Sequence, residues 1–471
     1  MMVRRHPSEP FHRRKRRKAL VIAYAFPPTG GSGVQRPAKF VKYLPDFGWE
    51  PVVWTVDSAE GFPRDPTLGD DLPPNTPIYF GRGGGGIRAV RRTLRGWIDP
   101  AQSQRRGLQS AASRLAMGLD WRLENWMAAR SFPDDCAGWA RRSLRPLMDV
   151  VAGEEIDIIF STFSPASSHL LAMEIKRRTR LPWVSDFRDL WTDDCRYHEP
   201  SAHRRAAHRR LEQEILETAD VVVGVTPRQT EILSDHVPDR RAKFVTITNG
   251  FDPDDFEVAS RRSLRSDDRF TLTYVGRFDL TRTRVELFDA LKSFADSLGT
   301  DCRRFRFLIV GPANRKIREH VAETGVEAEF VEFVPHAEAV RHMIDADALL
   351  LTSPDGPRAE SVIRAKVFEY LAASRPILSV GPTDGEAQRI VASCDAGLCV
   401  PFDSSEIRTA LRCLFDSWRS GKPRTGCRSA RLAPYSRIEL TKKLAEQFDQ
   451  LIGSRGRAPT VSREMVETGA P

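Results

Sequence analysis

Short apolar runs alternate with longer amphipathic stretches along most of this chain. Runs such as ALVIAYAF (19–26), PVVWTVD (51–57) and IDIIFSTFSP (156–165) are rich in Val, Ile and Phe and lead into Pro, Gly or Asp. Such runs predict buried strands, and the stretches between them carry apolar residues at helical spacing. This alternation is typical of parallel sheets covered by helices on both faces.

The alternation forms two blocks, and each block predicts a sheet of its own. The first block gives expected strands at 19–26, 51–57, 156–165, 181–189, 219–227 and 243–253. The second gives expected strands at 270–279, 305–312, 328–335, 347–354, 375–382 and 396–402. We therefore expect an α/β protein with two doubly wound, Rossmann-like domains that face an interdomain cleft, because ligands bind such sheets at the carboxyl ends of their strands.

The two blocks and the composition of the remaining segments divide the chain into six parts. Residues 58–86 inside the first block are rich in Pro and Gly and are expected to form a loop. The expected parts are a disordered basic tail (1–18), a first domain (19–230), a linker region (231–268), a second domain (269–428), a helix that could cross back to the first domain (429–452) and a disordered tail (453–471).

Composition indicates a globular protein, with 41% hydrophobic and 29% charged residues. No apolar run approaches the roughly 20 residues that a membrane span needs. The basic N-terminus is not followed by an apolar segment, which argues against a secretory signal. The seven Cys have no regular spacing, as expected for reduced thiols. These features favour a cytoplasmic location, and they leave open a position at the inner face of the membrane.

The net charge of +9 is concentrated in two regions. Residues 1–18 hold eight Lys or Arg and one Glu, which predicts a solvated arm or a tether to anionic lipid or nucleic acid. Residues 82–146 hold thirteen Arg and five acidic residues. Within them, 108–127 has apolar residues at helical spacing with Arg between, which fits a helix at a membrane surface or one packed on its own domain. We favour the packed helix.

The segment 360–382 carries the clearest local sign of chemistry. It reads as a loop, a helix and a strand, and Lys366 and Glu369 share one helical face while Val367 and Leu371 lie on the apolar face. The start of a helix that follows a strand favours anions, and a carboxylate one turn further in can accept two hydrogen bonds from a ribose diol. The segment predicts a nucleotide diphosphate site; the alternative is a core helix with a solvated Lys and Glu.

Two other loops follow predicted strands and could meet the same ligand. Gly31 and Gly33 lie in the loop after the first strand and would let the backbone approach a ligand closely. Gly276 ends the first strand of the second domain, with Arg277 and Arg282 behind it. Fixed guanidinium groups suit the charge that develops on a leaving diphosphate. Arg284 could replace Arg282, and a purely solvated role for all three arginines is the alternative.

The sequence KVFEYLAASRPIL around Glu369 resembles the donor-binding signature of GT-B glycosyltransferases, in particular those similar to family 4 (glycosyl transferases group 1). The resemblance implies that Glu369 holds the nucleotide ribose, as the second Glu of an E-x7-E motif. The first Glu would fall on Ser361, with Glu360 beside it, so the chain departs from the motif where the donor sugar is contacted. Arg277 and Arg282 match the places where the family carries cations for the diphosphate.

The first domain carries further motifs of this family. YAFPP before the Gly-rich loop and VQR after it resemble the family opening, which implies that Gly31 and Gly33 close over the donor phosphates and the acceptor. Arg36 is then expected to meet an anion, with a surface ion pair as the alternative. The next two resemblances are the DFRDLW block and an Asn-Gly turn. Asp186, Arg188 and Asp189 are expected to orient the acceptor or face the cleft, unless Arg188 forms a structural ion pair, and Asn249 is expected at a hinge or against the donor.

The sequence offers only weak candidates for metal ligands and for a catalytic acid or base. Many members of the family carry a His near the position of Thr162, whereas the nearby His169 begins an ordinary helix. The pair Asp134–Asp135 is not a convincing D-x-D motif, and the spacing of the Cys and His residues fits no familiar metal site. We expect no metal and no cofactor, with a nucleotide diphosphate sugar as co-substrate.

The resemblance implies a retaining, metal-independent glycosyltransferase of the hexosyltransferase type, in which Arg277, Arg282 and Lys366 stabilise the departing diphosphate. The expected partners are the nucleotide-sugar donor and a glycan or lipid-linked acceptor of cell-envelope or polysaccharide biosynthesis, with peripheral contact to anionic membrane and no nucleic acid. Three alternatives remain open: a nucleotide-sugar epimerase on the same fold, a non-catalytic protein that binds a nucleotide sugar, and a nucleic-acid binder driven by the basic tail.

Overall fold

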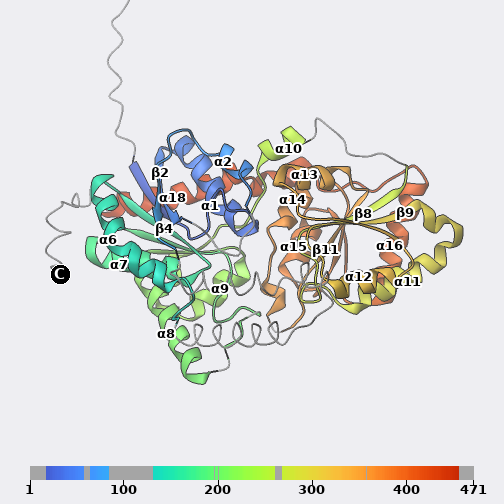
Figure 1. Ribbon diagram of the computed structural model, residues 1–471, viewed down its shortest axis with the longest axis horizontal. Coiled ribbons are helices and arrows are strands. Elements are labelled where there is room, and N and C mark those ends of the chain that lie inside the picture. Colours follow the sequence, from blue (N-terminus) through green and yellow to red (C-terminus); the bar gives the residue numbers. More distant parts are fainter. Residues whose placement is uncertain are drawn as a thin grey trace, which may run out of the picture.

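A computed structural model of the protein describes residues 17–57, 64–83, 131–195, 197–199, 201–259, 268–356 and 358–455. Two lobes lie side by side, and each is built around one sheet (Figure 1). The amphipathic segment 108–127, most of the basic N-terminal tail and the C-terminal residues after 455 lie outside the described residues.

The first lobe contains a parallel sheet of seven strands in the order β3-β2-β1-β4-β5-β6-β7. The order reverses between β1 and β4, and in doubly wound sheets this switch point is where ligands bind. The strands are β1 (Arg17–Ile22), β2 (Trp49–Val56), β3 (Ile78–Gly81), β4 (Ile158–Phe163), β5 (Trp183–Phe187), β6 (Val221–Gly224) and β7 (Phe244–Thr246).

The second lobe repeats the same plan with six parallel strands in the order β10-β9-β8-β11-β12-β13. Its switch point lies between β8 and β11. The strands are β8 (Phe270–Val275), β9 (Phe305–Val310), β10 (Glu327–Val331), β11 (Ala348–Thr352), β12 (Ile377–Val380) and β13 (Gly397–Val400). Two Rossmann-like domains were expected, and the two sheets confirm them.

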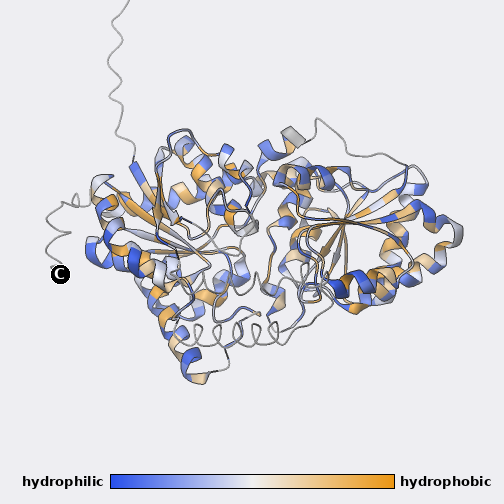
Figure 2. Ribbon diagram, viewed as in Figure 1, coloured by the Kyte–Doolittle hydropathy of each residue, from blue (hydrophilic) through white to orange (hydrophobic). Residues whose placement is uncertain are grey.

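Helices cover both faces of each sheet, so the central strands are largely apolar and the helices are polar on their outer sides (Figure 2). In the first lobe α6, α7 and α8 pack on one face, and α1 and α18 pack on the other. The helices of this lobe are α1 (Ser32–Tyr43), α2 (Thr67–Asp70), α6 (Ala137–Gly153), α7 (Ala166–Thr179), α8 (Ala202–Thr218), α9 (Pro227–Asp235) and α18 (Arg437–Arg455).

In the second lobe α11, α12 and α16 pack on one face, and α13, α14 and α15 pack on the other. Every helix in the described parts of the chain is too short or too polar to cross a bilayer. The remaining helices are α10 (Pro253–Ala259), α11 (Val285–Leu298), α12 (Arg315–Ala322), α13 (His336–Asp345), α14 (Lys366–Ala372), α15 (Glu386–Ser393), α16 (Ser404–Arg419) and α17 (Ser429–Leu432).

The structure differs from the expected boundaries at three places. The first sheet includes β7, so the first domain continues past residue 230 to Thr246. The expected loop 58–86 contains the edge strand β3, which pairs with β2. Arg17 and Lys18, assigned to the basic tail, begin β1 and pair with Trp49 and Glu50.

The chain crosses between the lobes twice, and the two crossings are hydrogen-bonded to each other. Phe251 pairs with Ser436: the Phe251 N–H donates to the Tyr435 carbonyl (3.1 Å), and the Arg437 N–H donates to the Phe251 carbonyl (2.8 Å). Gly250 is needed here, since a Cβ at this position would lie 2.2 Å from the Tyr435 oxygen. The second crossing continues into α18, which packs on the first domain.

The ring of Phe448 fixes α18 to the first sheet. It is fully buried and makes edge contacts with Trp49 and Phe160, at centroid distances of 5.2 and 6.3 Å. We expect Phe448→Ala to lower the free energy of unfolding by about 3–5 kcal/mol, because a buried aromatic ring is lost. Denaturant unfolding followed by Trp fluorescence measures this change. Gln450→Ala, on the exposed side of α18, is the control, and equal stability of the two variants would contradict the docking role of Phe448.

Candidate functional site

The second-domain side of the site begins where the chain leaves β8. Gly276 has a φ of +111°, a conformation that side chains other than Gly rarely adopt, and its N–H donates to the Val310 carbonyl (2.7 Å). A Cβ on Gly311 would lie 2.7 Å from the Gly276 oxygen, so the two glycines let the turns after β8 and β9 approach closely. This bend lies at the switch point of the second sheet.

Lys366, the first residue of α14, reaches back to the end of β8. Its Nζ donates to the Val275 carbonyl (3.2 Å) and lies 3.5 Å from the centre of the Tyr274 ring. The ring face attracts the ammonium group, which holds the side chain in place. The structure therefore brings Lys366 next to Gly276. The sequence had predicted that both residues would belong to one ligand site.

The surroundings of Lys366 are strongly cationic. Burial and the nearby guanidinium groups of Arg364 and Arg282 hold the pKa of Lys366 well below its usual 10.5. Arg282 pairs only loosely with Asp279, at 3.4 Å, and keeps about a third of its side chain exposed. Arg277 is exposed on the turn after Gly276. Such a cluster is stabilised by an anion, so its chemistry fits a diphosphate.

Arg284, the sequence alternative to Arg282, is already paired. Its guanidinium contacts Glu286 (2.6 Å) and Asp355 (2.8 Å), both near the surface. The structure therefore favours Arg282 over Arg284 as the second cation of the cluster.

Glu369 lies one turn into α14, on the same face as Lys366, but it points toward α13. Its Oε1 accepts a hydrogen bond from His336 Nε2 at 2.9 Å, and only 9% of the residue is exposed. Burial acts to raise the pKa of Glu369, but the hydrogen bond and charge of His336, together with Arg437 and Lys39, outweigh it and hold the pKa below 4.5. The carboxylate is therefore ionised at neutral pH and can accept hydrogen bonds.

Ser361 stands in a loop that is fastened to the first domain. Its hydroxyl donates to the Arg358 carbonyl (2.8 Å), and its own carbonyl accepts from Gln229 Nε2 of α9 (3.3 Å). Arg358 also forms an ion pair with Asp193 of the first domain. The hydroxyl is thus used within its own loop, and the contact to a donor sugar stays a prediction.

On the first-domain side, the Gly-rich loop is shaped by Arg188. This side chain donates to the carbonyls of Phe163 (2.5 Å), Ser164 (3.0 Å) and Gly33. A Cβ on Gly33 would lie 2.3 Å from the Arg188 Nη1 atom, which explains the need for Gly. Gly31 has a φ of +106° and directly precedes α1. Asp189 lies just after the end of β5 and is half-buried.

Arg36 and Asp186 are not cleft residues, contrary to expectation. They are 1% and 0% exposed, and the Arg36 Nη2 lies 2.7 Å from Asp186 Oδ1. Thr162 Oγ1 also donates to Asp186 (2.8 Å), and Arg36 donates to the carbonyls of Ile247 (2.9 Å) and Thr248 (2.7 Å). An ion pair was the alternative given for both Arg36 and Arg188. It forms with Arg36 because the Asp186 carboxylate points into the interior, where it needs a buried cation.

Asn249 belongs to the same arrangement. It is 8% exposed, and its Oδ1 accepts a long hydrogen bond from Arg36 (3.5 Å). With Gly250 it stands at the start of the first crossing between the domains, and the role of a hinge stays a prediction. Contact with the donor stays a prediction.

His169 is a core residue. It is fully buried, its Nδ1 lies 2.8 Å from Ser161 Oγ, and its ring packs against Phe187 and Trp183. Burial lowers the pKa of His169 to about 3, so the ring is neutral at physiological pH. The geometry gives it no access to a substrate.

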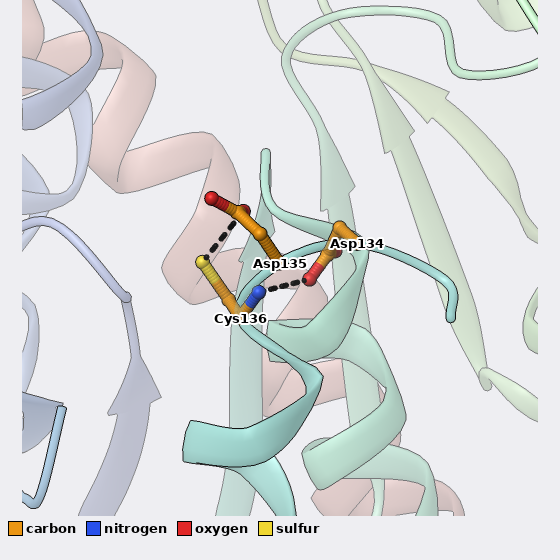
Figure 3. Close-up of side chains that lie close together, drawn as sticks. All are labelled: Asp134, Asp135 and Cys136. Atoms are coloured by element: carbon orange, nitrogen blue, oxygen red, sulfur yellow. Dashed lines mark hydrogen bonds between the residues drawn. The ribbon is translucent and has the colours of Figure 1, made fainter. Parts of the chain in front are cut away.

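Two groups of side chains among the described residues have the spacing of metal ligands. Figure 3 shows Asp134, Asp135 and Cys136 at the turn before α6. Asp134 accepts hydrogen bonds from the backbone N–H groups of Cys136 and Ser167 (both 2.9 Å), so it joins the starts of α6 and α7. These hydrogen bonds explain the position of the Asp134 carboxylate without a metal ion.

The second group surrounds a lysine. Asp71, Asp252 and Asp255 lie 2.6, 2.6 and 2.9 Å from Lys39 Nζ, which is almost fully buried. The ammonium group takes the place that a metal ion would need, and its pKa is raised above the usual 10.5 because the three carboxylates outweigh the effect of burial. The absence of a metal from the reaction stays a prediction.

Three functional candidates were missed in the sequence: His336, Asp255 and Arg437. They meet Glu369 or its neighbours from α13, α10 and α18. Only His336 carried a usable signal, since it directly follows a predicted strand and so lies at the ligand-binding edge of the sheet.

The buried pair Arg36–Asp186 gives a stability prediction. We expect Asp186→Asn or Arg36→Met to cost about 3–5 kcal/mol, because each leaves one buried charge without its partner. Arg277→Ala, at an exposed position, should change stability by less than about 0.5 kcal/mol. Denaturant unfolding of the three variants tests this, and a mild effect at Asp186 would contradict the burial of its charge.

Comparison with known families agrees with this geometry. Residues 30–250 match the family described as Glycosyl transferase 4-like domain, and residues 269–417 match the family described as Glycosyl transferases group 1. No curated protein matches the chain by sequence.

Solved structures share the fold at low sequence identity. HepE (Alr3699) of Anabaena in complex with UDP is 12% identical with a TM-score of 0.57, over 92% of this chain and 100% of that one. WaaG, a glycosyltransferase involved in lipopolysaccharide biosynthesis, is 15% identical with a TM-score of 0.54, over 92% and 99%. A candidate UDP-N-acetylglucosamine 2-epimerase from Listeria monocytogenes is 12% identical with a TM-score of 0.54, over 95% and 100%.

These structures establish the two-domain fold, and the two family matches together span most of the chain. Each match falls on one lobe, and the second includes Lys366 and Glu369. The chain therefore belongs to the group 1 (family 4) glycosyltransferases of the GT-B fold.

Proposed function

We propose that this protein moves a sugar from a nucleotide diphosphate sugar to an acceptor hydroxyl, with retention at the anomeric carbon. The cationic cluster at the second switch point carries the proposal. There, Lys366 lies against the end of β8 with Arg282 close by, and the ionised Glu369 lies one turn further along the same helix. The diphosphate of a nucleotide needs cations and its ribose needs a hydrogen-bond acceptor, and here the two kinds of group are one helical turn apart.

The residues divide the work between binding and charge stabilisation. Glu369 accepts hydrogen bonds from the ribose hydroxyls, while Lys366, Arg282 and Arg277 stabilise the negative charge that develops on the departing diphosphate. An anion next to Lys366 offsets the burial that depresses its pKa, so binding keeps the ammonium group protonated. Closure of the two domains excludes water and limits donor hydrolysis.

The proton balance requires no enzyme base. The bond from the anomeric carbon to the diphosphate oxygen breaks, the bond to the acceptor oxygen forms on the same face, and the leaving phosphate takes the acceptor proton. This route is supported by the position of His169, which is enclosed in the core. Gly31, Gly33 and Asp189 at the carboxyl edge of the first sheet would face the acceptor.

The proposed acceptor is a glycan or a lipid-linked intermediate of polysaccharide or cell-envelope synthesis, used in the cytoplasm at an anionic membrane surface. The Arg-rich composition of residues 82–146 supports an anionic partner. HepE was solved with UDP, so UDP is the first nucleotide to test. We propose a hexosyl donor and neither a metal nor a further cofactor.

An epimerase is the second candidate, since a structure named for that activity shares the fold. An epimerase interconverts nucleotide sugars without an acceptor, whereas a transferase releases the nucleoside diphosphate. Product analysis of a nucleotide sugar incubated with the protein alone separates the two. A protein that binds the sugar and changes nothing would be the non-catalytic alternative, which the Ser at position 361 favours.

The donor site is tested by thermal unfolding with UDP, GDP, ADP and TDP. A diphosphate at about 100 times its Kd should stabilise the wild type by about 2.7 kcal/mol. Glu369→Ala should lose this response, because the ribose loses its acceptor, while the exposed control Glu319→Ala should keep it. No stabilisation of the wild type by any of the four nucleotides would overturn the proposal.

The cationic cluster is tested by turnover. Lys366→Ala and Arg282→Ala should each lower kcat for release of the nucleoside diphosphate by about 10²–10³-fold, as expected when one stabiliser of developing charge is removed. Arg284→Ala is the matched control and should retain full activity, because its guanidinium is paired with Glu286 and Asp355. An equal loss of kcat in Arg284→Ala and Arg282→Ala would contradict the choice of Arg282 over Arg284.

A further inference from the structure

His336 connects the proposed ribose carboxylate to two other parts of the chain. It begins α13 at the carboxyl edge of the second sheet, and its Nε2 lies 2.9 Å from Glu369 Oε1. Its Nδ1 lies 3.6 Å from Asp255 Oδ2 in the linker helix α10, and its backbone N–H donates to Asp65 Oδ2 of the first domain (3.2 Å). One residue thus contacts the second domain, the linker and the first domain.

The linker contact extends into the first domain. Asp255 lies 2.9 Å from Lys39 Nζ of α1, and the same ammonium group is fixed by Asp252 and Asp71. Lys39, Asp255, His336 and Glu369 therefore form one chain of charged contacts from α1 to α14.

A second cation beside Glu369 also belongs to the first-domain frame. Arg437 is 1% exposed, and neither of its terminal amino groups has a hydrogen-bond acceptor among the described residues. It begins α18, which packs on the first sheet, and the charges of Glu369, Asp252 and Asp186 act on it. Of the three groups whose positive charge acts on Glu369, Arg437 and Lys39 belong to helices of the first domain, and His336 begins α13 of the second domain.

The ionisation of the pair follows from these contacts. Burial acts to lower the pKa of His336, but the hydrogen bond and charge of Glu369 and the charge of Asp255 outweigh burial and the opposing charge of Lys39, and the pKa rises above 6.5. The Asp65 carboxylate faces His336 only through the backbone N–H of that residue. The raised pKa of His336 favours the pair of an imidazolium and a carboxylate, and this pair weakens as the pH rises through that pKa.

A ribose diol needs an ionised carboxylate in a fixed orientation. The hydrogen bond from His336 occupies Oε1 of Glu369, fixes the rotamer of the side chain and leaves Oε2 as an acceptor. We propose that His336 positions Glu369 for the nucleotide ribose, and that its contacts to Asp65 and Asp255 make this positioning depend on the arrangement of the two domains. This inference rests on the proposed function and adds a positioning residue that also couples the domains.

The test is the affinity for UDP, or for whichever nucleoside diphosphate stabilises the wild type, measured by calorimetry between pH 6 and 9. His336→Ala should weaken binding by about 10–100-fold, the worth of a hydrogen bond to a charged group. His336→Gln keeps an N–H donor, so it should recover most of the affinity. Wild-type affinity should fall as the pH rises above 6.5, and the Gln variant should lack this fall.

The domain contact is tested separately with Asp65→Ala, which removes a residue that touches no part of Glu369. It should weaken nucleotide binding by about 3–10-fold, and its effect should disappear in the His336→Ala background, because coupled residues are not additive. His342→Gln, two turns along α13, is the matched control and should bind as the wild type does.

The outcomes separate this inference from the proposed function. Loss of binding in Glu369→Ala with unchanged binding in His336→Ala would overturn the role of His336 and leave the donor site in place. Equal pH dependence in the wild type and in His336→Gln would also overturn it, since a structural role predicts no difference between them. Absence of nucleotide binding to the wild type would overturn both.

Discussion

A guanidinium group buried in the first domain, that of Arg36, fixes the point at which the chain leaves that domain. It neutralises Asp186, and its remaining donors reach the carbonyls of Ile247 and Thr248, so the buried charge is fully satisfied only when the linker passes this point. The second crossing is then hydrogen-bonded to the first beside Phe251. The placement of the second domain relative to the first sheet depends on this pair.

The sheets were predictable because buried parallel strands are apolar on both faces and appear as continuous apolar runs. The edge strand β3 (Ile78–Gly81) was missed because it is only four residues long and partly exposed in a segment rich in Pro and Gly. The end of the first domain was placed too early, at residue 230, although a strand was expected at 243–253, because the apolar run of that strand continues into the linker. Short length and partial exposure hid β3 from the pattern.

The candidate site was predictable only where its residues are close in sequence. Lys366 and Glu369 lie on one short helix, so helical spacing alone places them on the same face. Arg36 and Asp186 are 150 residues apart, and the pattern gave no reason for Asp186 to pair with Arg36 in place of the neighbouring Arg188. The role proposed for His336 depends on contacts with three segments that are distant in sequence, and no local sequence pattern could reveal them.

The first domain is built from two separate pieces of chain, since α18 completes the face of the first sheet that holds Trp49 and Phe160. Ribosomes make that helix only after the whole second domain. During synthesis, the part of this face that α1 does not cover must wait until the whole second domain has emerged, and exposed apolar surface of this kind is where nascent chains aggregate or recruit chaperones. The second domain has no such delay, because its two ends, near Phe251 and Ser436, are hydrogen-bonded neighbours and it can fold as one inserted unit. The second domain can therefore complete its fold before the first domain receives α18.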